Sequence, residues 1–568
     1  MRVRGLLQAA PGAGKTTRVP LALIDQPWLD GKKIILLEPR RIAARNAARY
    51  MARQLNQTLA QLVGYRLRMD SRVGPQTRIE VVTEGILTRM IQSDPALEDV
   101  GCIIFDEFHE RSLQADLGLA LALECQQLLR EELRILIMSA TLDSQTLQKT
   151  LGQDLAIIRS EGRSFPVQTH YLGGELQRLR PEPLLDGLRR AIGETSGSIL
   201  CFLPGSGEIR RTLAALKTEV LPENLDLVPL YGALPPEQQD RAIAAPATGK
   251  RKLVLATDIA ETSLTIDGVS VVLDTGLSRN PRFNPRSGMS RLITHSVSQA
   301  SAEQRRGRAG RQQPGHCYRL WSEHQQQGFL AHNPAEILHA DLAPLALELA
   351  VWGADADELC WLDQPPKAHL EQARQLLTQL GALDANGKIT SMGQSMARLG
   401  THPRLAHMML KCKQLGWGSL GCDLAALLGE KDLLQGNSSS SAIAYQPAPT
   451  DIRLRLEYYY SAVSLPASSH SPTAHKRSVK RSEHSLLQRI KASSERWQRQ
   501  LKIGRGVQDP DKAGLLLCFA FPDRIAQRRG ENSWNYRLRN GSGAAFIDRD
   551  TLCKHPYIVA TELDGKQG

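Results

Sequence analysis

The chain has 568 residues, 42% hydrophobic and 23% charged, which is enough for several domains of about 100–200 residues and excludes a mainly disordered protein. Its net charge of +12 favours a polyanionic partner such as RNA or DNA, although acidic proteins and membranes also attract a basic surface. No run approaches the ~18 apolar residues of a membrane span, so we expect no membrane association, and Met1–Leu7 leaves no room for a signal peptide. The nine cysteines lack metal-site spacing, and we interpret them, Cys102, Cys201 and Cys518 included, as reduced core residues of a cytoplasmic protein.

The first motif, from Ala9 to Thr17, is typical of a phosphate-binding loop. Its glycines let backbone N–H groups converge on phosphate oxygens, and the dipole of the following helix adds to that attraction. Lys15 is expected to reach the β- and γ-phosphates of a nucleotide, and Thr16 to ligate Mg²⁺. Ala9 stands where the strict pattern has glycine, and an incidental glycine turn is the alternative. The predicted nucleotide-binding residues are Gly12, Ala13, Gly14, Lys15, Thr16 and Thr17.

Short apolar runs alternate with polar motifs and helical stretches through the first half. Such runs are typical of parallel strands covered on both faces, and ligands of parallel sheets gather beyond the carboxyl ends of the strands. The segments Ser164–Val167 and Leu172–Pro183 interrupt the series, which predicts two sheets with a boundary near residue 161. The expected strands are Lys33–Leu37, Val81–Thr83, Cys102–Phe105, Ile135–Met138, Ile199–Leu203, Leu253–Thr257 and Val269–Asp274.

Two polar motifs follow strands of the first predicted sheet. In Asp106-Glu107-Phe108-His109, one carboxylate can hold Mg²⁺ while the next aligns and deprotonates an attacking water. An acidic helix cap is the alternative, and we expect His109 to bridge to the second sheet. The second motif, Ser139-Ala140-Thr141, is by itself equally consistent with a helix N-cap.

A third motif, Gln304–Arg311, lies far along the chain. Arg308 and Arg311 are three residues apart, which places both guanidinium groups on one side of a helix turn, facing a single anionic site. Arginine supplied across a domain cleft stabilises charge on a γ-phosphoryl group during transfer. The alternative is a solvated basic helix touching RNA, for Arg305 and Arg306 in particular.

Further hydroxyl, glycine and arginine residues at strand ends are candidates for gripping nucleic-acid phosphates without reading bases. Each has an alternative role in turns or caps. Aromatic residues form only 5% of the chain, which argues against an extended base-stacking platform. The candidates are Arg40, Arg41, Thr83, Gly85, Thr257 and Thr262.

The second half changes character. Helical patterns at Ala340–Val351 and Ala368–Leu380, followed by the short run Lys388–Thr390, predict a winged-helix-like unit. Residues 436–484 are rich in serine, proline and basic residues, which predicts a loop or mobile insertion between helical segments. From about residue 506 the pattern predicts a strand-rich tail.

In their order, these motifs resemble those of a superfamily 2 helicase, most of all the DEAH/RHA group in its bacterial HrpB type. The resemblance covers roughly residues 6–325 and continues more weakly through Asp341–Ala343, His402–Leu405 and Phe521–Ala526. It departs from the family in Phe108 of the acidic motif, in residues 436–484, and in a shorter C-terminal part. The runs that carry it are Gly12–Thr16, Glu38–Arg45, Thr83–Leu87, Asp106–His109, Ser139–Thr141, Phe202–Gly205, Thr257–Ile266 and Gln304–Arg311.

The resemblance implies an α/β fold with two tandem RecA-like parallel-sheet domains, then winged-helix and helical-bundle domains and a partial β-rich C-terminal region. The expected boundaries are 1–160, 161–325, 326–397, 398–505 with the insertion 436–484, and 506–568. The implied roles are metal binding for Thr16 and Asp106, general base for Glu107, water positioning for Gln304, arginine fingers for Arg308 and Arg311, and coupling of hydrolysis to domain movement for His109, Ser139 and Thr141.

The resemblance further implies an ATP-dependent RNA helicase that requires Mg²⁺ and moves 3′ to 5′ on single-stranded nucleic acid, with the hairpin between Asp274 and Arg291 as a separating wedge. RNA is favoured over DNA by the resemblance alone. A remodelling ATPase without unwinding, a DNA helicase and a catalytically weak nucleic-acid-binding fragment remain alternatives. No adenine-specific motif is present, so we expect other NTPs to be accepted beside ATP.

Overall fold

The computed structural model of the protein forms two compact units. The first unit contains Met1–Arg282, Leu292–Ala340 and Ala356–Pro366, and the second contains the rest of the chain. The structure describes residues 3–9, 13–68, 70–140, 144–153, 155–160, 165–174, 181–261, 266–285, 288–430, 433–434, 450–464, 481–504, 506, 508–531, 533–546 and 550–563.

The first lobe of the first unit is built on an eight-stranded sheet in the order β4-β3-β5-β2-β6-β7-β1-β8. Its strand pairs are parallel except β3 with β4. The central strand β6 is buried at every position, as expected for a strand covered on both faces. The strands are β1 (Arg4–Ala9), β2 (Lys33–Glu38), β3 (Val63–Leu67), β4 (Asp70–Arg72), β5 (Ile79–Thr83), β6 (Val100–Phe105), β7 (Arg134–Ser139) and β8 (Ala156–Ser160).

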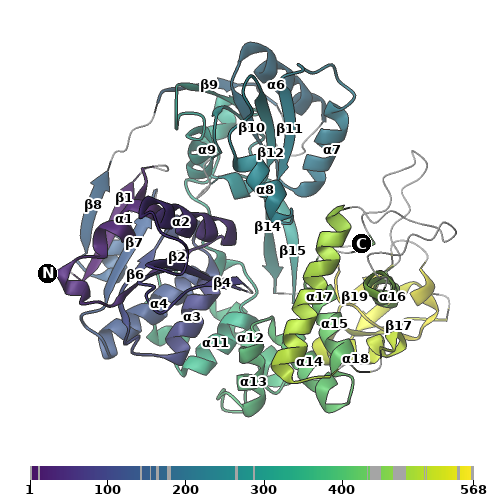
Figure 1. The fold of residues 1–568 in the computed structure, drawn as a ribbon. Coiled ribbons are helices and arrows are strands. Elements are labelled where there is room, and N and C mark those ends of the chain that lie inside the picture. Colours follow the sequence, from purple (N-terminus) through teal and green to yellow (C-terminus); the bar gives the residue numbers. More distant parts are fainter. Residues whose placement is uncertain are drawn as a thin grey trace. The chain divides into compact units, whose positions relative to one another are not determined.

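Helices cover both faces of this sheet (Figure 1), with α1 packed beside α2 and α3 packed beside α4. The α2 side buries alternate strand residues such as Ile34, Leu36 and Ile104 against Ala44 and Met51. Alternation along a strand sends the intervening residues to the opposite face. The helices are α1 (Lys15–Leu23), α2 (Arg41–Gln54), α3 (Glu84–Ser93), α4 (Leu113–Leu128) and α5 (Ser144–Leu151).

The second lobe has a six-stranded parallel sheet in the order β11-β12-β10-β13-β16-β9. Ile199 and Cys201 enter one core cluster with α6 and α7, and Leu200 and Phe202 enter the cluster on the other face. The strands are β9 (Val167–Tyr171), β10 (Ser198–Phe202), β11 (Leu225–Leu230), β12 (Arg251–Ala256), β13 (Val269–Asp274) and β16 (Gly315–Arg319), and the helices are α6 (Pro181–Glu194), α7 (Ser206–Leu216), α8 (Pro236–Ile243), α9 (Gln299–Arg306) and α10 (Glu323–Gln327).

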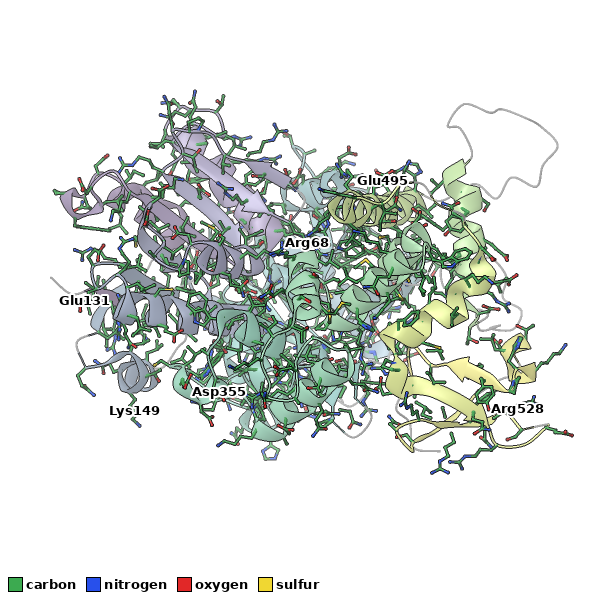
Figure 2. The ribbon with its side chains drawn as sticks, turned by 90° about the horizontal axis from the view of Figure 1, so that it is seen from below. Arg68, Glu131, Lys149, Asp355, Glu495 and Arg528 are labelled. Atoms are coloured by element: carbon green, nitrogen blue, oxygen red, sulfur yellow. The ribbon has the colours of Figure 1, made fainter. Side chains whose placement is uncertain are left out.

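A two-stranded hairpin, β14 (Leu277–Asn284) and β15 (Met289–Ser296), follows β13. Its tip, Phe283–Arg291, belongs to the second unit, which otherwise consists of helices and a four-stranded antiparallel sheet in the order β19-β18-β17-β20. Arg528, labelled in Figure 2, lies on β17. The elements are α11 (Ala343–Trp352), α12 (Lys367–Gln379), α13 (Ser391–Leu399), α14 (Pro403–Gln414), α15 (Gly418–Leu428), α16 (Ile452–Ser464), α17 (Arg481–Leu501), α18 (Ala513–Ala520), β17 (Ile525–Arg528), β18 (Asn535–Leu538), β19 (Gly543–Ala545) and β20 (Tyr557–Val559).

All seven predicted strands are present, while several predictions for the second half of the chain differ from the structure. The loop predicted from 436 to 484 is wrong at α16, because Leu456 and Tyr459 recur at helical spacing and are buried. The predicted strand-rich tail from about residue 506 begins with helix α18, and its strands follow. The run Lys388–Thr390 forms a single β-bridge, between Leu383 and Ile389, rather than a strand. Most of the rest of 436–484 lies outside the described residues.

All nine cysteines are free thiols, although Cys360 and Cys518 are partly exposed rather than core residues. Among the described residues, no helix combines the length and apolar character that crossing a membrane requires.

Candidate nucleotide-binding site

Four polar motifs gather at one edge of the first-lobe sheet. Strands β2, β6, β7 and β1 are neighbours in the parallel part of the sheet, so their carboxyl ends lie at the same edge. Glu38, Asp106 and Ser139 stand at or just beyond the ends of β2, β6 and β7, and the phosphate-binding loop follows β1. The topology therefore brings together Lys15, Thr16, Asp106, Glu107 and Ser139 among the predicted site residues.

The phosphate-binding loop presents its lysine to the acidic motif. Gly14 caps helix α1 with φ 81°, a left-handed conformation that glycine adopts without strain. Lys15 is 5% exposed, and its Nζ lies 3.2 Å from both Oε1 and Oε2 of Glu107. Thr16 Oγ1 donates a hydrogen bond to Asp106 Oδ2. Ala13 and Thr17 flank these residues as predicted, while Gly12 lies outside the described residues.

The acidic motif turns sharply after strand β6. Glu107 N donates to Asp106 Oδ1 at 2.8 Å, and Glu107 has φ 47°, which is unusual for a residue with a side chain. The Phe108 ring packs edge-to-face on Phe105, with centroids 5.7 Å apart, so the third position of the motif is a packing position. This turn points both carboxylates toward the phosphate-binding loop.

The two carboxylates differ in their electrostatic surroundings. Burial, followed by the charge of Glu107, raises the pKa of Asp106 above its ordinary value. Burial also acts to raise the pKa of Glu107, but the Lys15 ammonium outweighs it and the net pKa is lowered. Glu107 is therefore held ionised, as a group that orients and activates water must be.

Glu38 is a third buried carboxyl that the sequence reasoning did not assign to the site. It is fully buried, and the carboxyls of Asp106 and Glu107 lie near it. Burial, followed by the charges of Asp106 and Glu107, raises the pKa of Glu38 well above its ordinary value. An acidic residue at the carboxyl end of the apolar run β2 was the signal that could have identified it.

These residues fit a divalent cation. Thr16 and Asp106 supply the hard oxygen donors that Mg²⁺ prefers, and the negative charges of Asp106 and Glu107 act on the buried carboxyl of Glu38. Mg²⁺ in such sites is bound by one or two side chains together with substrate phosphates and water. When bound, Mg²⁺ neutralises charge that develops on the phosphates.

The arginine motif of the second lobe lies in the electrostatic field of Glu107. Arg308 is 4% exposed and donates through Nε to the carbonyl oxygen of Glu261 at 3.0 Å. Burial, then the neighbouring charge of Arg311, lowers the pKa of Arg308, and the charge of Glu107 acts in the opposite direction. Burial lowers the pKa of Arg311 to about 10, again opposed by Glu107. Both guanidiniums therefore lie close enough to the acidic motif to interact with it.

Two expectations about this motif are wrong. Helix α9 ends at Arg306, so Arg308 and Arg311 lie in the turns that follow it rather than on a helix face. Arg305 is not a solvated basic residue: it is buried and pairs with Glu261 Oε2 at 2.8 Å and Asp274 Oδ1 at 2.9 Å. Its role is to join segments of the second lobe.

The predicted coupling residues lie beside the acidic motif. His109 Nδ1 accepts a long hydrogen bond, 3.5 Å, from Ala140 N, so its described hydrogen bond stays within the first lobe and does not bridge to the second sheet. Ser139 is fully buried, and Thr141 lies outside the described residues. Gln304, 8% exposed, lines with His109 a cavity of about 270 Å³ within the first unit.

The predicted nucleic-acid residues are divided between several environments. Arg40 is engaged within the protein: its Nη1 donates to the carbonyl oxygen of Asp258 at 2.7 Å, and its Nη2 lies 3.3 Å from Glu110 Oε2. Burial acts to lower the pKa of Arg40, but Glu110 and Asp258 outweigh it and raise it. Arg41 and Gly85 are exposed, Thr83 and Thr257 are partly buried at strand ends, and Thr262 lies outside the described residues.

Comparison with known protein families supports this geometry. Residues 4–150 match the DEAD/DEAH box helicase model, residues 184–313 match the helicase conserved C-terminal domain, and residues 373–401 match the winged-helix of the helicase associated domain (HA2). These matches cover the two lobes and the region from α12 to α13.

Individual relatives point to the same family. The chain is 44% identical over 559 residues to the ATP-dependent RNA helicase HrpB of Escherichia coli (strain K12), which covers 98% of this chain and 64% of that protein. It is 36% identical over 440 residues to the probable ATP-dependent RNA helicase DHR2 of Saccharomyces cerevisiae, covering 74% and 59% of the two chains. The crystal structure of the Escherichia coli DEAH/RHA helicase HrpB superposes with a TM-score of 0.82 at 42% identity, covering 98% of this chain and 66% of that chain.

Two parallel-sheet lobes, a phosphate-binding loop, an acidic motif and an arginine motif in that order are the features of the DEAD/DEAH box class, whose two domain models the chain matches. Within that class, the chain belongs to the DEAH/RHA family. It spans about two thirds of the length of the HrpB relative that it matches.

Proposed function

We propose that the chain is an ATP-dependent RNA helicase that couples NTP hydrolysis to 3′-to-5′ movement on single-stranded RNA and to duplex unwinding. The observation that carries the proposal is the pairing of Lys15 with Glu107, in the field of Arg308 and Arg311 from the second lobe. A γ-phosphoryl group brought to Lys15 is thereby placed between an ionised carboxylate and two guanidiniums. Positioning and charge stabilisation of this kind supply most of the catalysis in phosphoryl transfer.

The residues have separate tasks in this proposal. Lys15 leaves Glu107 for the phosphates, which frees Glu107 to orient and deprotonate the attacking water together with Gln304. Thr16 and Asp106 hold Mg²⁺, and Arg308 and Arg311 stabilise charge on the terminal phosphate. Release of phosphate removes the group that holds the arginines, and His109, Ser139 and Thr141 pass that change to the domains.

The test is NTP hydrolysis measured with poly-RNA, with single-stranded DNA and without polymer at one fixed salt concentration, because phosphate contacts are salt-sensitive. We expect RNA to stimulate most and tailed RNA duplexes to be unwound from a 3′ tail. Stimulation without strand displacement would instead identify a remodelling ATPase, and stronger stimulation by DNA would identify a DNA helicase. Absence of hydrolysis under all three conditions would contradict an NTPase role.

Two finer points belong to the same proposal. We expect ATP and GTP to be hydrolysed at similar rates, since no adenine-specific motif is present in the sequence; a large preference for ATP would contradict this. We also propose a cytoplasmic location, which nine unpaired cysteine thiols favour because disulfides are rare in that compartment.

A further inference from the structure

Three short segments that the nucleotide site does not use lie together in the second unit: those around Asp341, His402–Arg404 and Asp523. His402 Nε2 lies 3.1 Å from Asp341 Oδ2. Arg404, 5% exposed, forms a two-pronged pair with Asp523, at 2.5 Å from Nη1 to Oδ1 and 2.8 Å from Nη2 to Oδ2. A paired, buried arginine of this geometry holds segments in fixed register. The network therefore joins three segments that are more than 50 residues apart in sequence.

The tip of the β14–β15 hairpin is fixed to this network. Arg524 Nη2 donates to the carbonyl oxygen of Gly288 at 2.7 Å, and Gln372 Nε2 donates to the carbonyl oxygen of Pro285 at 2.6 Å. Met289 packs in a core cluster with residues of the C-terminal sheet, including Tyr536. Within the second unit, the hairpin tip is thus held from helix α12 and from the C-terminal sheet.

A cavity of about 220 Å³ lies between these elements. Two rings, Phe283 and His369, contact each other edge-to-face at 6.0 Å, an arrangement that leaves ring surface for a further planar group. The buried Nδ1 of His369 has no hydrogen-bond partner among the described residues, and leaving such a group unsatisfied is costly. Amides and charged groups complete the lining through Gln372, Gln375, Gln379, Asn540, Asp341, Arg404 and Asp523.

Size and charge restrict what the cavity can take. It is smaller than the roughly 300–1,000 Å³ of pockets for drug-sized ligands, so it suits a single heterocycle rather than a whole nucleotide. A phosphate is disfavoured, because Asp341 and Asp523 both line the cavity and the guanidinium of Arg404 is already paired. Aromatic rings beside amides that donate and accept hydrogen bonds match an uncharged nucleobase.

We propose that this cavity binds one unpaired nucleobase of the nucleic-acid strand, turned out of the strand at the hairpin tip. The inference rests on the proposed function, since the strand must pass the hairpin. Binding at this position removes one base from its neighbours, and stacking against Phe283 and His369 offsets the lost stacking. The hairpin tip is then a base-capturing element as well as a wedge.

The test uses single-stranded RNAs that carry either 2-aminopurine or an abasic nucleotide at one position, scanned along the strand. In the wild type we expect one position where 2-aminopurine fluorescence changes and where the abasic nucleotide lowers affinity about tenfold, in line with about 1–3 kcal/mol per stacked base. In Phe283→Ala and His369→Ala, the abasic nucleotide at that position should cost no more than elsewhere. His555→Ala, an exposed change in the same unit, is the matched control and should behave as the wild type.

An equal abasic penalty at all positions in the wild type would overturn the inference. The same position-specific penalty in the wild type and both variants would also overturn it. RNA-stimulated hydrolysis in the same samples would show that the proposed function still holds. Absence of both RNA binding and RNA-stimulated hydrolysis in the wild type would instead overturn the proposed function. Free 2-aminopurine riboside is the second arm. Binding of the riboside as tight as that of RNA, and lost in His369→Ala, would identify a free nucleobase as the ligand and overturn the assignment to a strand.

Discussion

Lys15 Nζ lies at the same distance, 3.2 Å, from both carboxylate oxygens of Glu107, and both side chains are almost fully buried. The phosphate-binding lysine and the proposed general base thus neutralise each other until a nucleotide separates them. A buried charge that loses its partner is strongly unfavourable. The pair is therefore broken only by a group, such as a phosphate, that replaces Glu107 as the partner of the lysine.

Glu107→Gln should leave NTP binding close to normal and reduce turnover by about 100-fold or more, because the amide cannot accept the proton of water. Equilibrium binding of a fluorescent nucleotide and steady-state phosphate release measure the two quantities. Glu131→Gln is the control, since Glu131, labelled in Figure 2, is exposed and lies in the turn before strand β7 rather than in the acidic motif. A turnover within a few-fold of the wild type would remove Glu107 from the role of base.

Arg308→Ala should lower kcat far more than it weakens nucleotide binding, because a guanidinium on the terminal phosphate acts mainly in the transition state. We expect a loss of at least about 100-fold in kcat. Arg306→Ala is the matched control, since Arg306 lies in the same motif, pairs with Glu303 just before it and is partly exposed. Equal losses in the two variants would contradict a specific role for Arg308.

Arg40→Ala tests whether this residue exchanges a protein contact for a nucleic-acid phosphate. Its guanidinium now joins Glu110 of the first lobe to the carbonyl of Asp258 in the second. We expect RNA binding to weaken for all sequences alike and the slope of log affinity against log salt to fall by about 1. Glu110→Gln should strengthen RNA binding, because it weakens the competing contact. An unchanged salt slope in Arg40→Ala would show that Arg40 holds the lobes together and does not contact the strand.

Gly310→Ala should destabilise the second lobe and reduce turnover through the adjacent Arg311. A Cβ at Gly310 would lie 2.5 Å from the carbonyl oxygen of Phe165, which is too close for any real contact. We expect a loss of about 1–3 kcal/mol in unfolding free energy. Gly193→Ala on helix α6 is the control, because its Cβ would meet no atom within 4 Å and should be neutral or stabilising. Urea unfolding of both variants measures the difference, and equal midpoints would contradict the steric argument.

Asp423 should make stability depend on pH in the helical part of the second unit. Its carboxylate accepts hydrogen bonds from Ser494 and Tyr460, yet burial raises its pKa to about 6 from the ordinary 3.8. The folded protein therefore binds more protons than the unfolded chain between these values, so stability falls as the pH rises through this window. The shift corresponds to about 3 kcal/mol at most.

Asp423→Asn lacks this titration. As the pH rises from about 4 to 7, the free energy of unfolding of the wild type should therefore fall relative to that of Asp423→Asn. Urea unfolding midpoints across this range, with Glu131→Gln as the control, test the expectation. Parallel pH profiles for the wild type and Asp423→Asn would contradict it.

Strands with long apolar runs were predictable, and strands with mixed faces were not. Strand β6, before Asp106, is buried throughout, and its continuous apolar sequence predicts a strand. Strand β9 (Val167–Tyr171) carries threonine, glutamine and histidine with no buried position, so only its pairing with β16 identifies it. Strands β14 and β15 likewise mix polar and apolar residues and are partly exposed, so no long apolar run indicates them in the sequence.

The candidate site shows the same division. Lys15, Thr16, Asp106 and Glu107 could be grouped from sequence because each follows a strand of one parallel sheet. The partner of Arg40 could not, because it is a backbone carbonyl 218 positions along the chain that carries no residue-type signal. Contacts that depend on backbone atoms or on how two lobes approach each other are set by packing rather than by local pattern.

Strand β1 (Arg4–Ala9) lies between β7 and β8, so its neighbours in the sheet begin at residue 134 and end at residue 160. During synthesis, β1 must remain without these neighbours until about 150 further residues have followed, at about 5–20 residues per second. Roughly ten seconds of exposure for an apolar segment is a window in which a chaperone, or a second nascent chain, can bind it. Correct folding of the first lobe therefore depends on keeping β1 from wrong partners until β7 and β8 have been made.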